Sequence, residues 1–515
     1  METRYKIHPA IGVARVGESA TSFDGPDVRD PGFAPATYRD GADKIKRQAA
    51  RFRIYEYEFP NAFEADKQDG MATVREITIA DVEQIEWMIK LGNRKMFTAH
   101  PYTDPANQTP HLSIPAELTI TLTPANATAL AAGAAQKIEG QISGTAPPLR
   151  VTLGEFATDA DGRLRALAGK GLAGSLPGAG APTDLRNPKW WDDTADGPVR
   201  AKLTLNGGAV VMASSAWLVT ASPDYAHAIE CTVSLYDLAY SIACDNFGYT
   251  PPARPSMRRH IYPILLAAER AGWTSNQLLP HFGASVHAFT TGARFDLLRS
   301  NNKAIGSPAR AAREALKGLL RNGAGGTMPK LRAEAAAELA LPAAIYKIFE
   351  KWAQGEFVAD FFPAIGPIVP SLAMRPARDR GNALDQAHMG AMVGGGFFPG
   401  IEVGKDINDL AHWAGAFRIK DTIVPGTLTK DLAVPWQSDF SLCTTVWWPS
   451  HRPDVAIRNG ATATRADFRV WHAAGPAAMV DDWKKLGFLR TREIGGKTVI
   501  METERKLAEG AAIVP

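Results

Sequence analysis

The first 240 residues alternate between short β-branched runs and turn residues, a pattern that predicts strands. VREITI (Val74 to Ile79), LTITLT (Leu118 to Thr123) and VVMASSAWLVTA (Val210 to Ala221) are bounded by Gly, Pro, Asn and Asp. Between the last two runs, the stretch from Leu172 to Asp196 is rich in Gly and Pro and contains the letters WWDD. We interpret that stretch as a long surface loop, in which the two tryptophans serve local packing.

The pattern becomes helical at about residue 255. Residues Ile261 to Trp273 carry an apolar stripe at helical spacing. Ser307 and Pro308 supply an N-cap and a first-turn proline for ARAAREALKGLLRNG, whose last glycine is placed to end the helix. LRAEAAAELA and AIYKIFEKWA continue in the same style. These stretches predict a structural helical segment.

From about residue 360 the regular patterns give way to stretches dense in aromatic residues, Gly and Pro. Examples are FFPAIGPIVPSLAMRP, MVGGGFFPGIEVG and PWQSDFSLCTTVWWPSHRPD. Irregular backbone rich in Phe and Trp indicates buried, tightly specified loops, which often carry function. After Gly475 and Pro476, AAMVDDWKKLGF predicts a helix with Met479, Trp483 and Leu486 on one face.

Together these patterns predict an α+β protein with a β-rich N-terminal half, a helical middle and an irregular, loop-rich C-terminal region. We place the boundaries at 1–250, 251–360 and 361–515, packed as one compact unit, and assign catalysis to the last region. The 515 residues are 45% hydrophobic and 22% charged, as in a globular protein with an ample core.

Charge and hydropathy narrow the choice of partners and compartment. The formal net charge is +3 and no basic tract is interleaved with aromatics, so nucleic acid is not an expected partner. No apolar run is long enough to span a membrane. The opening METRYKIHPAIGVARVG lacks the apolar core of a signal peptide. We therefore expect a cytoplasmic protein without a membrane anchor.

Common catalytic motifs are absent from the sequence. GxxxxGK[ST], HExxH, CxxC and GxSxG do not occur, which excludes the simplest P-loop, metalloprotease, dithiol and α/β-hydrolase interpretations. The eleven histidines show no close pairing, so no metal is expected. Cys231, Cys244 and Cys443 are too few and too scattered for a disulfide framework or a zinc site.

Cys443 lies in the most unusual segment, VPWQSDFSLCTTVWWPSHRPD. Asp439 precedes it by four residues, three tryptophans lie within seven residues of it, and His451 and Arg452 follow. A carboxylate beside a thiol raises the thiol pKa, the wrong direction for a thiolate nucleophile. From the residues alone, a buried structural cysteine remains the simpler interpretation.

Several stretches along the chain resemble the cysteine tryptophylquinone amino-acid oxidases, the family of the lysine ε-oxidases and glycine oxidases. The matching stretches, which thin out between about 275 and 355, are IHPAIGVARVG, IKRQAARFRIY, IEWMIKLGNRK, LGEFATDADGRL, WWDDTADGPV, GGGFFPGIE and PWQSDFSLCTTVWWPSHRP. In this family a cysteine sulfur is bonded to a tryptophan whose indole has become an ortho-quinone. The resemblance implies that Cys443 is this cysteine and that Asp439 is an aspartate needed to make the cofactor.

The tryptophan partner is less sharply defined. Trp447 and Trp448 lie so close to Cys443 that a bond would close a cramped ring. We prefer Trp483, because MVDDWKKLGF resembles the family's segment and a helix would hold the ring rigidly. Trp471 is the second choice. An ordinary core tryptophan at helical spacing is the competing interpretation of Trp483.

The resemblance also implies an activity and partners. A quinone of this kind deaminates an amino acid or another primary amine oxidatively, releasing ammonia and, with dioxygen as acceptor, hydrogen peroxide. Asp439 is our first choice of base and His451 the second, and Arg452 is suited to bind a substrate carboxylate. A flavoprotein maturation partner and a homo-oligomer are implied as well. The alternatives are a dehydrogenase that passes electrons to a protein acceptor, and a non-catalytic family member without the cross-link.

Overall fold

The computed structural model describes most of the N-terminal half and a smaller share of the C-terminal region. The described residues are 1–29, 34–62, 73–94, 112–113, 116–142, 145–176, 190–231, 233–270, 289–320, 322, 326, 340–361, 371–392, 403, 405–430, 455–458, 464–467, 483–494 and 497–506.

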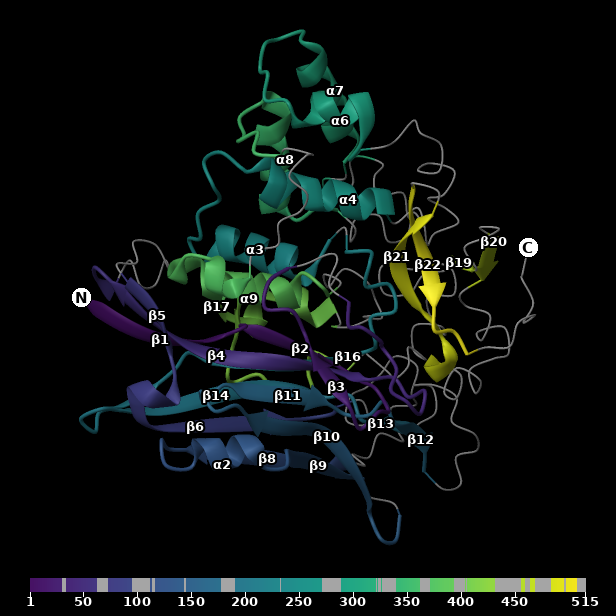
Figure 1. The fold of residues 1–515 in the computed structure, drawn as a ribbon. Coiled ribbons are helices and arrows are strands. Elements are labelled where there is room, and N and C mark those ends of the chain that lie inside the picture. The colour runs from purple at the N-terminus through teal and green to yellow at the C-terminus, as the bar shows by residue number, and fades with distance from the viewer. Residues whose placement is uncertain are drawn as a thin grey trace.

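Fourteen of the described strands form one large sheet in the N-terminal half (Figure 1). They are β1 (Glu2–His8), β2 (Ile11–Arg15), β3 (Ser22–Asp24), β4 (Arg47–Phe59), β5 (Thr73–Ile77), β6 (Val82–Leu91), β7 (Leu112–Ser113), β8 (Ala116–Leu122), β9 (Gln136–Ile142), β10 (Leu149–Thr158), β11 (Leu164–Ala168), β14 (Asp196–Leu205), β15 (Val210–Met212) and β16 (Ala216–Ala221). The hydrogen-bonded order is β7-β9-β10-β11-β4-β2-β16-β14-β6-β8, with β1, β3 and β5 pairing with β4 and β15 pairing with β14. Because β8 also contacts β9 near the other end of this order, the sheet curls toward closure.

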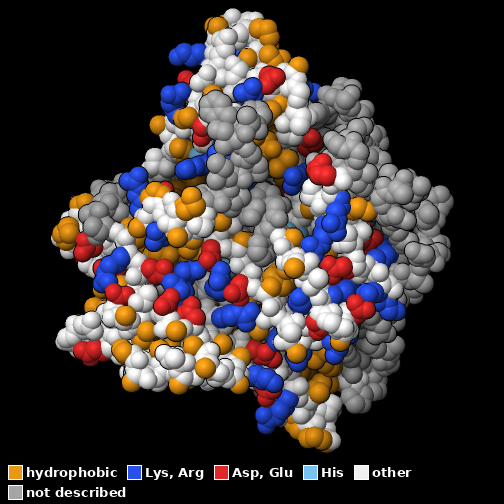
Figure 2. Space-filling model, in the orientation of Figure 1, with side chains coloured by type: hydrophobic (Ala, Val, Ile, Leu, Met, Phe, Trp, Pro, Cys, Tyr) orange, Lys and Arg blue, Asp and Glu red, His pale blue; other side chains and the backbone are white. Residues whose placement is uncertain are grey.

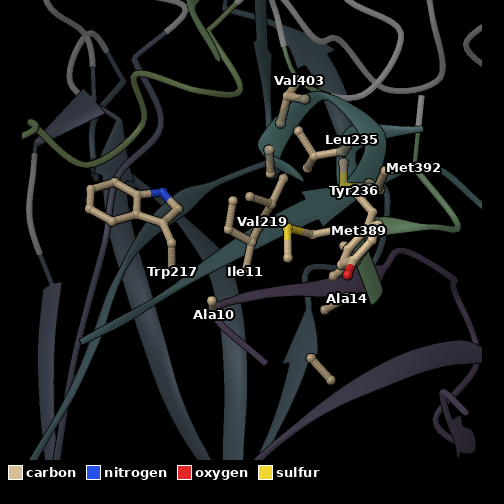
Figure 3. Close-up of a cluster of buried hydrophobic side chains, with 14 of the residues drawn as sticks. Ala10, Ile11, Ala14, Trp217, Val219, Leu235, Tyr236, Met389, Met392 and Val403 are labelled. Atoms are coloured by element: carbon tan, nitrogen blue, oxygen red, sulfur yellow. The ribbon is translucent and has the colours of Figure 1, made fainter. Parts of the chain in front are cut away.

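The centre of the sheet is its most apolar part. Every residue of β2 and of β16 is buried, and these two strands pair in parallel. Strands buried on both faces are expected to be continuously apolar instead of alternating. The helices α3 (Leu235–Asn246) and α9 (Ala377–Met389) cover this part of the sheet (Figure 1). Figure 3 shows side chains of β2, β16 and these two helices meeting in one buried cluster.

Buried polar contacts fix α9 on the sheet. Asp385 of α9 accepts a hydrogen bond from the backbone N–H of Ala10 at 2.6 Å and lies 2.9 Å from Nδ1 of His8. The Nε2 atom of His8 lies 2.9 Å from the Tyr57 hydroxyl and 3.2 Å from Arg418. Polar groups removed from water must find such partners, so this network specifies the position of α9 more sharply than apolar contacts do.

The middle of the chain is helical, as the sequence predicts. It contains the π-helical turn η3 (Met257–Ile261) and the helices α4 (Tyr262–Arg270), α6 (Gly292–Arg299), α7 (Pro308–Leu319) and α8 (Ala343–Gln354). Ser307 caps α7 by accepting a hydrogen bond from the N–H of Arg310 at 3.3 Å, and Pro308 occupies the first turn. The predicted start of α7 is confirmed. Its last residue is Leu319 and Leu320 is extended, whereas the glycine expected to end it lies outside the described residues.

The described C-terminal elements are short. They are η7 (Leu372–Met374), η8 (Lys405–Asn408), η9 (Leu410–His412), β17 (Trp413–Gly415), β18 (Arg418–Ile419), β19 (Val455–Arg458), β20 (Thr464–Asp467), η11 (Trp483–Lys485), β21 (Phe488–Ile494) and β22 (Lys497–Thr503). β21 and β22 form a hairpin beside α4 (Figure 1). The α+β fold with a β-rich N-terminal half, helical middle and loop-rich C-terminal region is confirmed. The domain boundaries proposed above stay predictions.

The predicted surface loop from Leu172 to Asp196 is wrong over its last residues. Trp190–Asp192 form the strand β13, which pairs with β12 (Ala173–Ser175), and Asp192 and Asp196 are buried. Asp196 accepts hydrogen bonds from the indole N–H of Trp217 at 2.9 Å and from the Thr429 hydroxyl at 2.8 Å. A run of Asp and Thr such as this one suggests exposure to solvent. Here hydrogen-bond donors from distant parts of the chain compensate for the burial of its polar groups.

On the face shown in Figure 2, Lys and Arg side chains are interspersed with Asp and Glu, without a broad area of one sign. Among the helices of the described ranges, none is long and apolar enough to cross a membrane.

Candidate active site around Trp483

Trp483 is one of the largest fully buried side chains, with 1% of its surface exposed. It begins the short 3-10 turn η11 at the entry to the β21–β22 hairpin. The Tyr225 hydroxyl donates a hydrogen bond to its carbonyl oxygen at 2.6 Å, and the N–H of Leu486 donates to the same oxygen at 3.2 Å. Backbone and ring are therefore both held in place.

The helix predicted across this segment is wrong from Trp483 onward, because tertiary partners take the carbonyl groups that a helix would use. The Arg39 guanidinium donates to the carbonyls of Lys484 at 2.6 Å and Leu486 at 2.8 Å. The N–H of Lys506 donates to the carbonyl of Lys485 at 2.7 Å. The chain then enters β21 at Phe488. The rigidity expected from a helix comes instead from these long-range hydrogen bonds.

Gly171 lies directly against the six-membered ring of Trp483. A Cβ placed on Gly171 would come within 2.7 Å of Cζ2 and 2.8 Å of Cη2 of the indole. Gly171 also has φ +74°, a left-handed conformation that favours glycine. The close approach of the ring and the backbone conformation both require glycine at this position.

Aromatic rings pack beside the Trp483 turn, and one of them, Tyr38, also lines a cavity. Tyr38 stacks on Phe488 with ring centroids 4.0 Å apart and an interplanar angle of 6°, and Tyr225 packs against Phe488 at 4.9 Å. Burial raises the pKa of both Tyr38 and Tyr225 well above the ordinary value, so both phenols stay protonated at neutral pH. Tyr225 can therefore act as the donor to Trp483.

The cavity has a volume of about 1340 Å³. Its described wall includes Tyr38 and His227, the strand residues Leu489 to Arg492 that follow the Trp483 turn, and side chains of η3, α4 and α9. A volume of this size is ample for an amino acid.

His227 of this wall lies beside a carboxylate. Nδ1 of His227 is 3.5 Å from Oδ2 of Asp224, and both side chains are almost completely buried. The His227 ring lies 6.5 Å from the Tyr38 ring, centroid to centroid. A carboxylate beside one ring nitrogen orients a histidine for proton transfer through the other. The chain thus places a histidine suited to proton transfer on the cavity, close to the aromatic wall.

Of the site residues predicted from sequence, the structure describes only Trp483. Asp439, Cys443, His451, Arg452 and the second-choice Trp471 lie outside the described residues. The cross-link and the roles of those residues therefore stay predictions. Within the described ranges, no group of three or more His, Cys, Asp or Glu side chains is arranged to hold a metal ion.

Sequence reasoning missed the residues that surround Trp483. Arg39, Gly171, Tyr225 and the Asp224–His227 pair come from stretches that are more than 250 residues away in the chain. The one local signal was that Gly171 is a glycine, the residue that favours a left-handed backbone. Because the chain contains 46 glycines, this signal could not single out Gly171. The fold alone brings these groups together.

Two family models and one curated relative match this chain. The family domain described as L-Lysine epsilon oxidase N-terminal matches residues 8–220, and the L-lysine epsilon oxidase C-terminal domain matches residues 322–462, together more than half of the chain. The L-lysine 6-oxidase of Marinomonas mediterranea is 25% identical over 550 residues, which cover 85% of this chain and 71% of that protein.

Solved structures agree on the fold. The crystal structure of the L-Lys epsilon-oxidase from Marinomonas mediterranea matches with a TM-score of 0.69 and 19% identity, covering 98% of this chain and 95% of the other. The crystal structure of its Schiff base intermediate with L-Lys gives the same values. At this identity the structural likeness establishes the fold and its extent along the whole chain.

Proposed function

This chain belongs to the L-lysine epsilon oxidase family, and on that premise we propose that it deaminates an amino acid oxidatively with a quinone made from its own side chains. The observation that carries the proposal is the placement of Trp483. Trp483 is fully buried, its carbonyl accepts a hydrogen bond from Tyr225, and the strand that follows it lines a cavity ample for an amino acid.

The surroundings of Trp483 fit a quinone on this residue. An ortho-quinone needs two adjacent ring carbons to carry oxygen, and the adjacent carbons Cζ2 and Cη2 lie against Gly171, which has no side chain to obstruct them. A quinone cofactor supplies an electron sink for the electron pair of the amine-bearing carbon. The protein must supply the position, the proton acceptor and the exclusion of water.

We assign the remaining roles as follows. Cys443 forms the thioether with Trp483, and Trp471 is the second choice of partner. Asp439 removes protons during cofactor formation and is the first choice of base during turnover, with His451 second. Arg452 holds a substrate carboxylate by a bidentate ion pair. A flavoprotein completes maturation, dioxygen accepts the electrons and becomes hydrogen peroxide, and the protein assembles as a homo-oligomer.

The described residues contribute positioning that these roles require. Tyr225 and Arg39 hold the backbone of the Trp483 turn through buried hydrogen bonds. Trp483 is 1% exposed, so its ring is kept from water, and Tyr38 stacks on Phe488 at the start of the strand that follows. A site held rigidly and kept dry is the arrangement that proton transfer from carbon needs.

Mass mapping of protein co-expressed with its flavoprotein partner tests the proposal. Two C–H groups converted to C=O and one thioether add two oxygens and remove four hydrogens, and the linked peptide should contain Cys443 and Trp483. Trp483→Phe should abolish the mass change, the quinone absorbance and the release of ammonia from L-lysine, whereas Trp471→Phe should keep all three. An unmodified wild-type chain after co-expression would refute the proposal. If the protein deaminates the amine in air without forming hydrogen peroxide, it is a dehydrogenase and not an oxidase.

A further inference from the structure

The cavity wall carries more positive charge than its carboxylates neutralise. Its described residues include seven arginines and four carboxylates. Glu230 is committed to Arg29, accepting two hydrogen bonds of 2.8 Å from one guanidinium. Asp237 accepts two bonds from Ser234 at the start of α3, at 2.8 and 2.9 Å. Neither of these carboxylates is left for another arginine.

The third carboxylate, Asp360, is also committed. Its two oxygens accept hydrogen bonds from the Ser256 hydroxyl at 2.6 Å and from the N–H of Arg258 at 3.0 Å. These bonds fix the π-helical turn η3, which carries Arg259 to the cavity wall. π-helical turns are rare and recur at functional sites. The fourth carboxylate, Asp379, forms its ion pair with Arg378, at 3.9 Å.

Arg259 and Arg375 both line the cavity. Burial and then the positive charge of Arg259 lower the pKa of Arg375. Among the described residues, neither guanidinium has a hydrogen-bond acceptor or a carboxylate within ion-pair distance. The Nε atom of Arg375 is buried without a partner in the part of the chain that the structure describes. Arg259 is exposed to solvent, whereas the buried Nε of Arg375 is an unsatisfied donor that an anion would satisfy.

We propose that Arg259 and Arg375 bind the carboxylate of the amino-acid substrate inside this cavity. A guanidinium matches a carboxylate in shape and can donate two parallel hydrogen bonds to it. The same cavity is bordered by Tyr38 and His227 beside the Trp483 turn, so a substrate held by its carboxylate directs its amine toward that wall. This assignment rests on the proposed function for the identity of the anion. It replaces Arg452, the choice made from the sequence, as the residue that binds the substrate carboxylate and so selects amino acids over simple amines.

Calorimetric titration with hexanoate, with hexan-1-ol as the uncharged probe, tests the anion site without any turnover. The wild-type protein should bind hexanoate more tightly than hexan-1-ol. Arg259→Gln and Arg375→Gln should each weaken hexanoate binding by roughly tenfold to hundredfold and leave hexan-1-ol unchanged. Arg150→Gln is the control, because this arginine is 74% exposed on β10 and does not border the cavity. Equal hexanoate binding by wild type and both cavity variants would overturn the assignment.

Steady-state kinetics then separates this inference from the proposed function. L-lysine and 1,5-diaminopentane differ only by the carboxylate. Arg375→Gln should raise KM for L-lysine by a factor similar to that in the titration and leave KM for 1,5-diaminopentane unchanged. An equal rise for both amines would overturn the assignment of the carboxylate. If mature wild type turns over neither amine but binds hexanoate through these arginines, the proposed function fails and the anion site stands.

Discussion

Replacing Gly171 by alanine tests whether the close contact between this backbone and the Trp483 ring matters. The added Cβ would lie 2.7 Å from Cζ2 of Trp483, whereas carbon atoms in favourable contact are roughly 3.5–4.0 Å apart. Because the ring is buried and its backbone is tied to Tyr225 and Arg39, it cannot easily move away. Forcing a methyl group into such a core costs about 1–3 kcal/mol. The left-handed backbone at φ +74° adds about 1–2 kcal/mol.

Gly292→Ala is a matched control for the backbone effect. Gly292 has φ +72°, but nothing lies within 4 Å of a Cβ placed there. Both variants lose the same conformational freedom in the unfolded chain. The difference between them therefore isolates the contact with the Trp483 ring, and we expect about 1–3 kcal/mol in the free energy of unfolding.

Two measurements decide the outcome. Urea unfolding followed by far-ultraviolet circular dichroism should give the lowest midpoint for Gly171→Ala, with Gly292→Ala between it and wild type. Visible absorbance per mole of co-expressed protein should show less quinone in Gly171→Ala and a normal amount in Gly292→Ala. Equal midpoints and equal quinone content in the two variants would refute the reasoning that the Gly171 contact shapes the cofactor site.

Three further predictions concern buried polar groups. Tyr225→Phe removes the donor to the Trp483 carbonyl and should lower the free energy of unfolding by about 1–3 kcal/mol in urea titrations, with reduced quinone yield; an unchanged midpoint would contradict the role given to this hydrogen bond. Burial lowers the pKa of His388 to about 4, so the folded state keeps this side chain neutral. Its contribution to the free energy of unfolding is present above pH 6.5 and is lost as the pH falls through 4. His388→Gln should therefore flatten the acid limb of a stability–pH profile by about 3 kcal/mol, and a limb of unchanged steepness would show that other groups dominate it. Burial raises the pKa of Asp196 to about 6, so the folded state favours the protonated carboxyl. Its contribution to the free energy of unfolding is present below about pH 4 and is lost as the pH rises through 6. Asp196→Asn should remove that decline between pH 4 and 6 in the same profile, and a decline that persists in the variant would assign it to another residue.

The sequence predicted those parts of the fold that depend on neighbours along the chain. β-branched runs predicted strands, and the run from Leu118 to Thr123 coincides with β8 as far as Leu122. Ser307 and Pro308 predicted the start of α7, because an N-cap and a first-turn proline act within one helical turn. The run from Val210 to Ala221 was less accurate, since the chain leaves the sheet between β15 and β16.

Patterns failed where distant partners decided the outcome. The apolar spacing around Trp483 predicted a helix, but Arg39 and Lys506 take the backbone carbonyls of the turn and a strand follows. Asp196 belongs to a polar run that suggested a surface loop, yet Trp217 and Thr429 supply the donors that allow its burial. Local propensity is worth a few tenths of a kcal/mol per residue, so about 1 kcal/mol from one buried hydrogen bond is enough to override it.

By itself, the sequence determined the α+β character, the capped helix of the middle segment and the resemblance to quinone-forming oxidases that singled out Trp483. These depend on the order of residues within short stretches or on likeness along the whole chain. Only the tertiary structure decided that Trp483 rests on Gly171, that His227 lies on the cavity with Asp224 beside it, and that Arg259 and Arg375 both line it. The physical reason is that contact and electrostatic interaction depend on distance in space, and the fold joins residues that are tens to hundreds of positions apart in the chain.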